Sequence, residues 1–403
     1  MRELLVVGAG PVGLSAALAA RALDIHVTVV EAERADRVRP GSRALYIHHE
    51  NLLRLDRMSQ GLGAKIAGFG IVWSARRTFY GGHEVFVDRF DTESATALPS
   101  YTSLRQVDTE AFLLDACRAA GVEFVWDAPI AGVRTTSDRV TATDAGGRSW
   151  DARYLIAADG ARSAVRHSLD IPWQGERSTD YRVAVDLADD PAGAEPRPAE
   201  RLCHYRHPAM AGRNLFVVPF SGGRQVDVQC LDRADAERLG DEAQVRGWLR
   251  RVVEPDCVDR VLWAARYPCL QLVAASFVDE HRRVLLAGEA AHLFAPLGAR
   301  GMNSGIADAD AAATAVAVAL RATHGERAAA AVDEYQSRRR QAALHNRAAA
   351  GAALRFLRAD TVIARARLAV AGRLARVLPP CGAWLDRAPF GPRGPVTVRE
   401  GRY

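Results

Sequence analysis

The sequence predicts an α/β fold of Rossmann-like topology, with an added antiparallel sheet and helices at the C-terminus. Residues 3–31 read, in order, as strand, glycine turn, helix and strand. Segments in the middle of the chain alternate apolar and polar residues or are rich in β-branched ones, as half-buried strands are. Late in the chain, a short apolar strand leads through a glycine-rich turn into residues 296–320, which are alanine-rich and favour a long helix. The 403 residues, 49% of them hydrophobic, supply enough apolar surface for a sizeable core in about two to three domains.

The first motif is a glycine turn between a strand and a helix. Residues 3–8 are predicted to form a buried strand, and residues 11–23 a helix opened by a proline. The turn between them has a GxGxxG pattern made by Gly8, Gly10 and Gly13. Without a Cβ atom in the way, backbone N–H groups and the helix N-terminus can face a pyrophosphate. A second strand, residues 26–31, ends at Glu31, 18 residues after the last glycine, near the spacing of an acid that meets a ribose hydroxyl. This order predicts a bound dinucleotide with free ribose hydroxyls, as in FAD or NAD, and does not choose between the two.

A second motif lies in residues 154–169, which read YLIAADGARSAVRHSL. The apolar half predicts a buried strand that ends at Asp159, and a helix is expected to begin near Ser163. Taken alone, an Asp-Gly turn before a helix is equally compatible with an ordinary structural turn.

The third motif is the entrance to the alanine-rich helix. A strand at residues 285–288 runs into a turn that carries Glu289 and His292. The helix entrance that follows is crowded by Gly298, Gly301 and Gly305. Several N–H donors and the positive end of a helix dipole should meet there, which suits an anionic or electron-rich group. Close helix packing through small residues explains 307–319, but it does not explain Asn303 among the glycines.

Together, the three motifs, GAGPVG, DGARSAVR and GEAAHLFAPLGARGMNSG, resemble those of the flavoprotein aromatic hydroxylases. These are single-component FAD monooxygenases typified by p-hydroxybenzoate hydroxylase and the hydroxyphenylpropionate hydroxylases. The resemblance implies a discontinuous FAD-binding domain of the glutathione-reductase-like type, an inserted substrate domain with an antiparallel sheet, and a C-terminal helical segment and tail. The boundaries expected for these three parts are 1–72, 99–171 and 275–356; 73–98 and 172–274; and 357–403. Strands of the substrate domain are expected at 84–90, 181–187, 214–220 and 225–231.

The resemblance also implies contacts with non-covalently bound FAD along the length of the cofactor. The pyrophosphate and adenosine ribose would be met by Gly8, Gly10, Gly13 and Glu31. The flavin ring would lie near Pro296, Gly301, Met302 and Asn303. Further contacts with the cofactor are expected from Arg43, Gln106, Asp159 and Arg213. Glu289 stands where the family has an aspartate, and its longer side chain could still accept hydrogen bonds from the ribityl chain.

By this resemblance, the protein is expected to be an NAD(P)H-dependent FAD monooxygenase that hydroxylates an aromatic or phenolic small molecule through a C4a-hydroperoxyflavin. NAD(P)H would bind transiently in a groove, and O2 would be the second co-substrate. A side chain that helps to deprotonate a phenol would accelerate the reaction. The candidates are His204, Tyr205 and His207 in the substrate domain, or Tyr46 and His48 near the ring. Residues 203–207 also read as an ordinary strand with polar positions toward solvent.

Two other functions remain open. One is a flavin-binding protein without turnover that shields or routes a pathway intermediate, for which the replacement at Glu289 leaves some room. The other is a flavin halogenase, but the sequence lacks the WxWxIP segment of those enzymes, and Lys65 is its only lysine.

Composition excludes several further classes. Arginines are spread along the chain despite a net charge of +5, so no nucleic acid partner is expected. Six cysteines without paired spacing predict free thiols and no metal site. Glycines interrupt the N-terminal apolar run, so we expect no signal peptide, no integral membrane segment and a cytoplasmic location. The protein is expected to be a monomer or a homodimer. The basic amphipathic residues 359–380 are expected to dock on the protein's own core.

Overall fold

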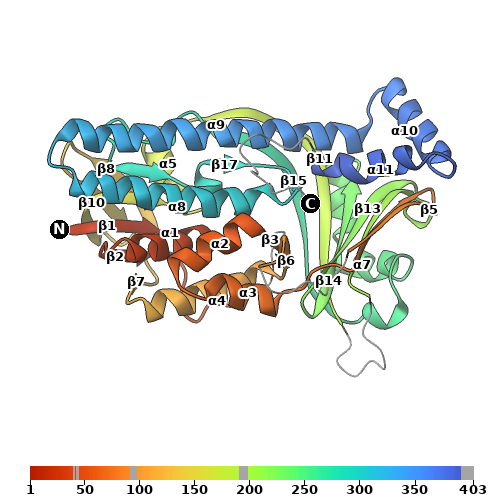
Figure 1. Ribbon diagram of the computed structural model, residues 1–403, viewed down its shortest axis with the longest axis horizontal. Coiled ribbons are helices and arrows are strands. Elements are labelled where there is room, and N and C mark those ends of the chain that lie inside the picture. The colour runs from red at the N-terminus through yellow and green to blue at the C-terminus, as the bar shows by residue number, and fades with distance from the viewer. Residues whose placement is uncertain (40, 42–44, 91–97, 190–197, 392–403) are drawn as a thin grey trace.

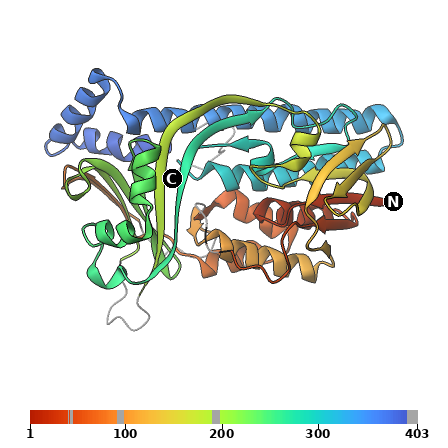
Figure 2. The ribbon, with the colours of Figure 1, turned by 180° about the vertical axis from the view of Figure 1, so that it is seen from behind.

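The computed structural model describes residues 1–39, 41, 45–90, 98–189 and 198–391. Two sheets lie toward opposite ends of an elongated molecule, and a long helix, α9 (Gly325–Arg358), runs across both (Figure 1). The view from behind shows two long strands, β11 (Trp173–Ala188) and β15 (Val261–Ala274), that reach from one end toward the other (Figure 2). The mixed α/β class expected from the sequence is therefore present.

The first sheet has seven strands, in the order β7-β2-β1-β10-β9-β8, with β16 paired to β10. Its parallel strands are β1 (Arg2–Val7), β2 (Val27–Val30), β7 (Glu123–Val125), β10 (Ser149–Ala157) and β16 (Val284–Leu286). The antiparallel strands at one edge are β8 (Ile130–Thr135) and β9 (Val140–Asp144). In a parallel sheet all carboxyl ends meet at one edge, which is where such folds bind ligands. The turns after β1, β2, β10 and β16 therefore converge.

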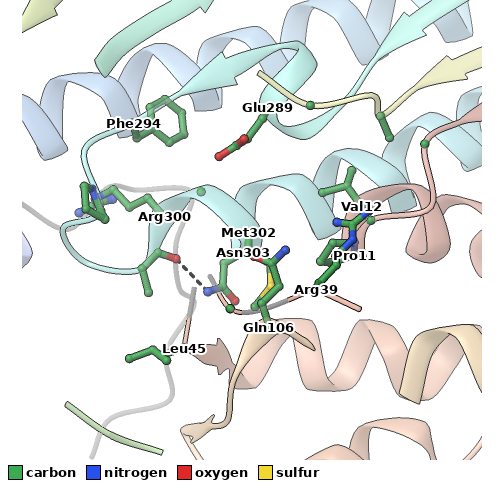
Figure 3. Close-up of a pocket in the computed structure, with 18 of the residues that line it drawn as sticks. Pro11, Val12, Arg39, Leu45, Gln106, Glu289, Phe294, Arg300, Met302 and Asn303 are labelled. Atoms are coloured by element: carbon green, nitrogen blue, oxygen red, sulfur yellow. Dashed lines mark hydrogen bonds between the residues drawn. The ribbon is translucent and has the colours of Figure 1, made fainter. Parts of the chain in front are cut away.

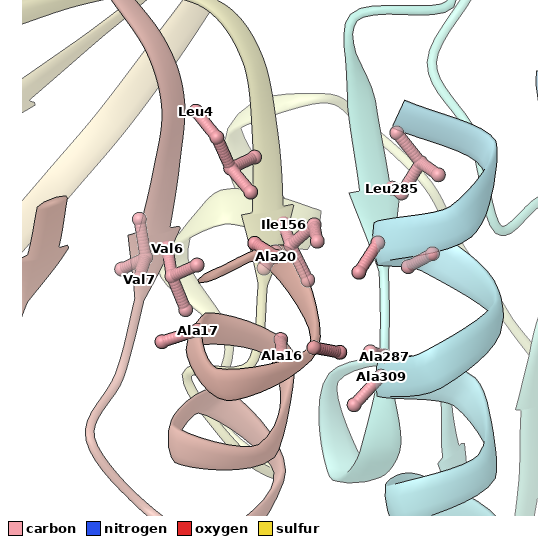
Figure 4. Packing of buried hydrophobic residues seen from close by; sticks show 14 of the residues in the cluster. Leu4, Val6, Val7, Ala16, Ala17, Ala20, Ile156, Leu285, Ala287 and Ala309 are labelled. Atoms are coloured by element: carbon pink, nitrogen blue, oxygen red, sulfur yellow. The ribbon is translucent and has the colours of Figure 1, made fainter. Parts of the chain in front are cut away.

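Two helices pack on this sheet through small side chains. Helix α1 (Pro11–Ala22) and helix α8 (Arg300–Arg321) face each other with alanines such as Ala16, Ala20 and Ala309 (Figure 4). A Cβ atom added at Gly305 would lie 2.4 Å from Cγ2 of Val12. The alanine-rich composition of α8 is thus explained by close packing against α1, as the sequence suggested.

The second sheet has eight strands, in the order β17-β15-β11-β14-β13-β12-β4-β5. Its remaining strands are β4 (Ala75–Tyr80), β5 (His83–Arg89), β12 (Glu200–His207), β13 (Arg213–Phe220), β14 (Gly223–Cys230) and β17 (His292–Leu293). The four strands expected from alternation coincide with β5, β11, β13 and β14, except that residues 90 and 231 lie one position beyond the ends of β5 and β14. The sheet is nevertheless mixed, because β12 and β4 run parallel. The hairpin β4–β5 comes from a separate stretch of the chain, so its direction beside β12 is not fixed by a tight turn.

The two faces of this second sheet differ in character. We call the face that carries Arg182 and Asp186 of β11 the inner face, and the opposite one the outer face. On the outer face, Val183 and Val185 belong to an apolar cluster that also contains residues of α6 (Arg233–Leu239) and α7 (Glu242–Leu249). On the inner face, cross-strand partners bring Asp227 opposite both Ala184 and Phe216. Since side chains alternate along a strand, neighbouring residues of one strand point to opposite faces of the sheet.

The C-terminal helix α10 (Val362–Leu374) docks through its later part. Ala371 belongs to an apolar cluster that also contains Val85 and Leu385, and a Cβ atom added at Gly372 would lie 2.3 Å from Tyr80. Val362 and Ile363, at the start of the helix, are each 73% exposed. It stands beyond the end of α9 (Figure 1) and packs beside α11 (Pro379–Arg387), which buries Leu385 in the same cluster. Among the helices in the described part of the chain, none is both long enough and apolar enough to cross a membrane.

Candidate functional site

A cavity of about 860 Å³ joins the carboxyl edge of the first sheet to the inner face of the second. Such a volume falls within the range of about 300–1,000 Å³ that pockets for cofactors and small ligands occupy. One part is lined by the turns after the parallel strands, with Gly8, Glu31, Asp159 and Glu289. The other part is lined by side chains of the second sheet, among them Arg182, Arg201, Phe216, Val218, Gln225 and Asp227. Three turns that are distant in the sequence therefore share one cavity, as the motifs predicted.

The three glycines of the first turn have different structural roles. Gly8 has φ +101°, and a Cβ atom there would lie 2.5 Å from the carbonyl oxygen of Ala158. A Cβ atom at Gly13 would lie 1.8 Å from the carbonyl oxygen of Gly8, so the glycine permits helix α1 to approach the turn closely. Gly13 itself does not line the cavity. Gly10 lines the cavity, and the nearest atom to its added Cβ would be Nη1 of Arg39 at 3.9 Å. The protein leaves Gly10 free toward the cavity, as close approach by a ligand requires.

Glu31 and Asp159 present carboxylates at the same edge. Glu31 is 6% exposed, accepts the N–H of Ala9 through Oε2 and the N–H of Glu33 through Oε1 (3.0 Å), and lines the cavity. Asp159 accepts the N–H of Val165 through Oδ2 (3.1 Å), while its buried Oδ1 has no partner. Burial raises the pKa of Asp159 against the opposing hydrogen bonds from Ser163 and Val165. An unpartnered acceptor of this kind fits a hydroxyl donor of a ligand.

The turn between β16 and α8, which we call the late turn, shows why glycine recurs at the entrance of α8. Gly288 and Gly298 have φ values of +61° and +72°, which favour glycine. A Cβ atom at Gly298 would also lie 2.9 Å from the carbonyl oxygen of Phe390, whereas at Gly301 nothing lies within 4 Å. Gly301 lines the cavity beside the first turn of α8, and Figure 3 shows Glu289 pointing into the same space. The glycines thus shape the backbone and leave the helix N-terminus open to a ligand.

Asn303 connects the first turn of α8 to a neighbouring strand. Its amide accepts from the N–H of His48 (2.9 Å) and from Nδ2 of Asn51 (2.8 Å), and it donates to the carbonyl oxygens of Tyr46 (3.0 Å) and Ala299 (2.8 Å). The side chain therefore ties α8 to β3 (Tyr46–His48). Asn303 still lines the cavity, together with Pro296 and Met302.

Gln106 and Arg39 form a polar group on the side of α4 (Gln106–Ala119). Gln106 donates to Oε1 of Glu110 (2.8 Å), and Arg39 lies 3.3 Å from the same oxygen. Both residues line the cavity, and Arg39 is an addition to the residues expected from the sequence. Arg43 lies outside the described residues.

An aromatic group stands where the two parts of the cavity meet. Tyr46 lines the cavity, and its ring packs edge-on against Trp73 (5.4 Å) and tilted against Tyr101 (5.6 Å). Burial raises the pKa of Tyr46, and the positive charges of Arg201, Arg300 and Arg76 oppose that rise. His48 is neutral near pH 7, since burial and Arg300 lower its pKa to about 4.

The structure does not bring the other proposed proton-transfer residues or Arg213 to the cavity. His204 pairs with Leu215 on the outer face and stacks on Phe79. Tyr205 lies on the inner face, but its hydroxyl donates to the carbonyl oxygen of Leu385 (2.7 Å) in the core beneath α9 and α11. Arg213 also projects from the outer face and forms a two-pronged pair with Asp235 (2.9 Å each). Strand parity therefore separates His204 and Arg213 from the cavity.

His292 belongs to a buried network beneath the late turn. Its Nε2 lies 2.7 Å from Oδ2 of Asp308, which also accepts the N–H of Gly288 (3.1 Å). Nε of Arg339 donates to the other oxygen of Asp308 (2.6 Å). Although burial alone would raise it, Arg339 and His292 hold the pKa of Asp308 below its ordinary value. This network fixes the turn that presents Glu289.

Sequence reasoning missed the arginines of the inner face. Arg182 and Arg201 line the cavity although they are 1% and 5% exposed. They lie in strands whose alternation was visible, but no motif marks them, and their common side follows only from the register of the sheet. In the described residues, no three His, Cys, Asp or Glu side chains gather as a metal site would require.

Comparison with known proteins gives one family. The sequence model of a family described as FAD binding domain matches residues 1–349. The chain is 28% identical over 345 residues to a 3-(3-hydroxy-phenyl)propionate/3-hydroxycinnamic acid hydroxylase of Escherichia coli, a match that covers 84% of this chain and 59% of the relative. The chain thus spans about three fifths of the length of the curated relatives it matches.

Solved structures share the fold. A p-nitrophenol 4-monooxygenase from Pseudomonas putida DLL-E4 has a TM-score of 0.75 at 24% identity, over 98% of this chain and 99% of that chain. A flavin-dependent monooxygenase determined in complex with FAD and substrate also has a TM-score of 0.75, at 20% identity, over 96% of this chain and 70% of that chain.

Proposed function

The chain belongs to the family of FAD-binding aromatic hydroxylases, and on this premise we propose that it is an NAD(P)H-dependent monooxygenase that hydroxylates an aromatic or phenolic small molecule. The observation that carries the proposal is the shared cavity, in which the carboxyl edge of a parallel sheet faces a second sheet lined by aromatic and cationic side chains. FAD is the cofactor of the family. O2 and NAD(P)H would be the co-substrates.

The residues of the cavity fit FAD on two observations. The open approach at Gly10 suits a pyrophosphate at the N-terminus of α1, because an extended phosphate group needs backbone N–H donors without a Cβ atom nearby. The unpartnered Oδ1 of Asp159 and the carboxylates of Glu31 and Glu289 suit sugar and ribityl hydroxyls. Pro296, Gly301 and Met302 would then lie beside the ring, at the positive end of α8.

FAD, when bound, would supply the two-electron redox chemistry and the activation of O2. The chain's own residues would position the substrate and exclude water. Phe216, Phe294 and Trp73 line the space beside the late turn, so an aromatic ring would be enclosed by apolar walls. Of the candidate proton-transfer residues, the geometry favours Tyr46, because it alone among Tyr46, His204 and Tyr205 lines the cavity.

The domain division belongs to the same proposal. The FAD-binding domain would comprise 1–72, 99–171 and 275–356, and the substrate domain 73–98 and 172–274. The cavity would lie between them, with NAD(P)H bound transiently and the protein assembled as a monomer or homodimer.

Anaerobic stopped-flow measurement of flavin reduction tests the proposal. The protein is reconstituted with FAD and mixed with NADH or NADPH, with and without each member of a panel of phenols and aromatic acids. We expect at least one compound to accelerate the loss of flavin absorbance and to yield a hydroxylated product when O2 is admitted. A protein that binds FAD but is reduced by neither nucleotide with any compound would instead be a flavin-binding protein without turnover.

A further inference from the structure

Arg201 of β12 is a buried cation with unused hydrogen-bonding capacity. It is 5% exposed, and its closest carboxylate oxygen is Oδ1 of Asp386, 3.6 Å from its Nη1, which is too long for a hydrogen bond. Its Nη1 atom is buried and has no hydrogen-bond partner among the described residues. Asp386 is shared, since Nη2 of Arg76 lies 3.3 Å from its other oxygen. A guanidinium group has five N–H donors, and burying it unpaired is costly. Arg201 therefore has donors to offer a ligand.

The guanidinium group of Arg182, on β11, is oriented by an ion pair on the same inner face. Its Nε donates to Oδ1 of Asp227 (2.5 Å), and Oδ2 of Asp227 accepts the hydroxyl of Tyr267 (2.7 Å). Both oxygens of Asp227 are thus engaged, and the pair fixes the orientation of the guanidinium group. Nη1 of Arg182 is buried without a partner. One carboxylate therefore orients Arg182 through Nε but leaves its Nη1 without a partner.

The two arginines flank one aromatic side chain in the cavity wall. The guanidinium carbons of Arg182 and Arg201 lie 5.0 and 5.8 Å from the ring centroid of Phe216, which stands between them on β13. All three residues line the cavity. Positive charge near the cavity extends beyond this pair. Burial raises the pKa of Tyr46, which lines the cavity, and the charges of Arg201, Arg300 and Arg76 oppose that rise.

We propose that Arg182 and Arg201 form an anion subsite that binds a carboxylate of the aromatic substrate beside Phe216. The planar fork of a guanidinium group matches a carboxylate, and a low-dielectric wall strengthens the pairing. The substrate is then an aromatic acid, and its acid group sets the orientation of the ring in the cavity. This inference rests on the proposed function, since it concerns the substrate of the same site. An alternative is that both arginines only brace Asp227 and Asp386 and touch no ligand.

Equilibrium binding to the FAD-loaded protein distinguishes these alternatives without turnover. The probes are 3-hydroxyphenyl alkanoic acids of increasing chain length and their neutral carboxamides, titrated against the flavin absorbance spectrum. We expect at least one acid to bind at least tenfold more tightly than its amide. Arg201→Met should abolish this preference by weakening the acid at least tenfold while changing the amide less than twofold. Arg201→Lys, which retains the charge but loses the planar fork, should restore part of it.

Arg224→Met is the matched control. Arg224 lies on β14 of the same sheet but pairs with Asp189 (3.0 Å) and does not line the cavity. Its removal deletes one half-buried arginine from the sheet and should leave the ratio of acid to amide affinity unchanged. Melting temperatures and FAD content of all variants separate misfolding from loss of the subsite.

The proposal is overturned if acids and amides bind alike to the unmodified protein, or if no acid perturbs the flavin spectrum at millimolar concentration. It is also overturned if Arg201→Met weakens both members of a pair equally, since a bracing role alone would do so. Failure to bind FAD at all would contradict the proposed function instead, and is recognised before any acid is added.

Discussion

Gly10→Ala should separate cofactor binding from folding. Gly10 has φ −80° and ψ −178°, an extended conformation that alanine adopts without strain. The added methyl group would meet no protein atom closer than 3.9 Å. The apo protein should therefore keep its stability within about 0.5 kcal/mol, or gain slightly because the unfolded chain loses freedom.

The same methyl group would project into the cavity beside the N-terminus of α1. Forcing one extra methyl group into a packed contact costs about 1–3 kcal/mol. At about 1.4 kcal/mol per tenfold change, FAD should bind roughly 5- to 150-fold more weakly to Gly10→Ala. Apo melting temperature and FAD affinity, the latter from quenching of flavin fluorescence, measure the two effects separately.

Two further glycine variants serve as controls for this result. Gly13→Ala should lower the stability of the apo protein itself, because its methyl group would lie 1.8 Å from the carbonyl oxygen of Gly8. Gly68→Ala lies in helix α3 (Leu62–Phe69), where an added Cβ meets nothing within 4 Å, and should change neither FAD affinity nor fold. Unaltered FAD affinity in Gly10→Ala would refute the argument that this turn faces the cofactor.

Four other outcomes are expected. Burial raises the pKa of Asp186 from 3.8 to about 6, so its contribution to stability is present below about pH 4 and is lost as the pH rises to 6; Asp186→Asn should remove this slope in urea titrations of the apo protein and stabilise it by on the order of 3 kcal/mol or less at pH 7. Asp308→Asn should cost about 3–5 kcal/mol of unfolding free energy, because the partly buried Arg339 loses the carboxylate with which it pairs. Asp310→Asn, which removes the carboxylate of the more exposed pair with Arg57, should cost less than about 1 kcal/mol, and equal effects would contradict the network. Arg213→Met should lower urea stability but leave FAD affinity unchanged, and a weakened FAD complex would place this arginine at the cofactor after all. Of the six thiols, Cys381, which is the one not fully buried, should react with a thiol reagent in the native state, and the remaining five only after denaturation.

The cofactor half of the cavity was predictable because its determinants are local. A strand, a glycine turn and a helix follow one another within residues 2–22, and the position of Glu31 follows from the length of that unit. Parallel strands bring their carboxyl ends to one edge, so Asp159 and Glu289 arrive beside Gly8 without any knowledge of side-chain packing. Their residue types and spacing therefore carried the information.

The substrate half was not predictable, because it depends on register between distant strands. Alternation shows that neighbouring residues point to opposite faces, but it does not say which face meets the cavity. His204 and Arg213 had suitable chemistry and lie on the outer face. Arg182 and Arg201 reach the cavity only because β11, β14, β13 and β12 pair in a particular order. Likewise, the hydrophobic pattern of α10 did not reveal that Val362 and Ile363, at its start, are exposed.

The contrast follows from what the two sheets offer to a ligand. A sheet edge presents backbone N–H groups, helix N-termini and a few acids, which recognise the phosphates and hydroxyls common to all dinucleotides. A sheet face presents side chains, which neighbouring strands select and which differ from one family member to another. Recognition of FAD can therefore persist at low sequence identity, whereas the choice of substrate depends on a few residues such as Arg201. Exchanging inner-face side chains while keeping the edge intact should accordingly change which aromatic acids bind, and leave FAD affinity unaltered.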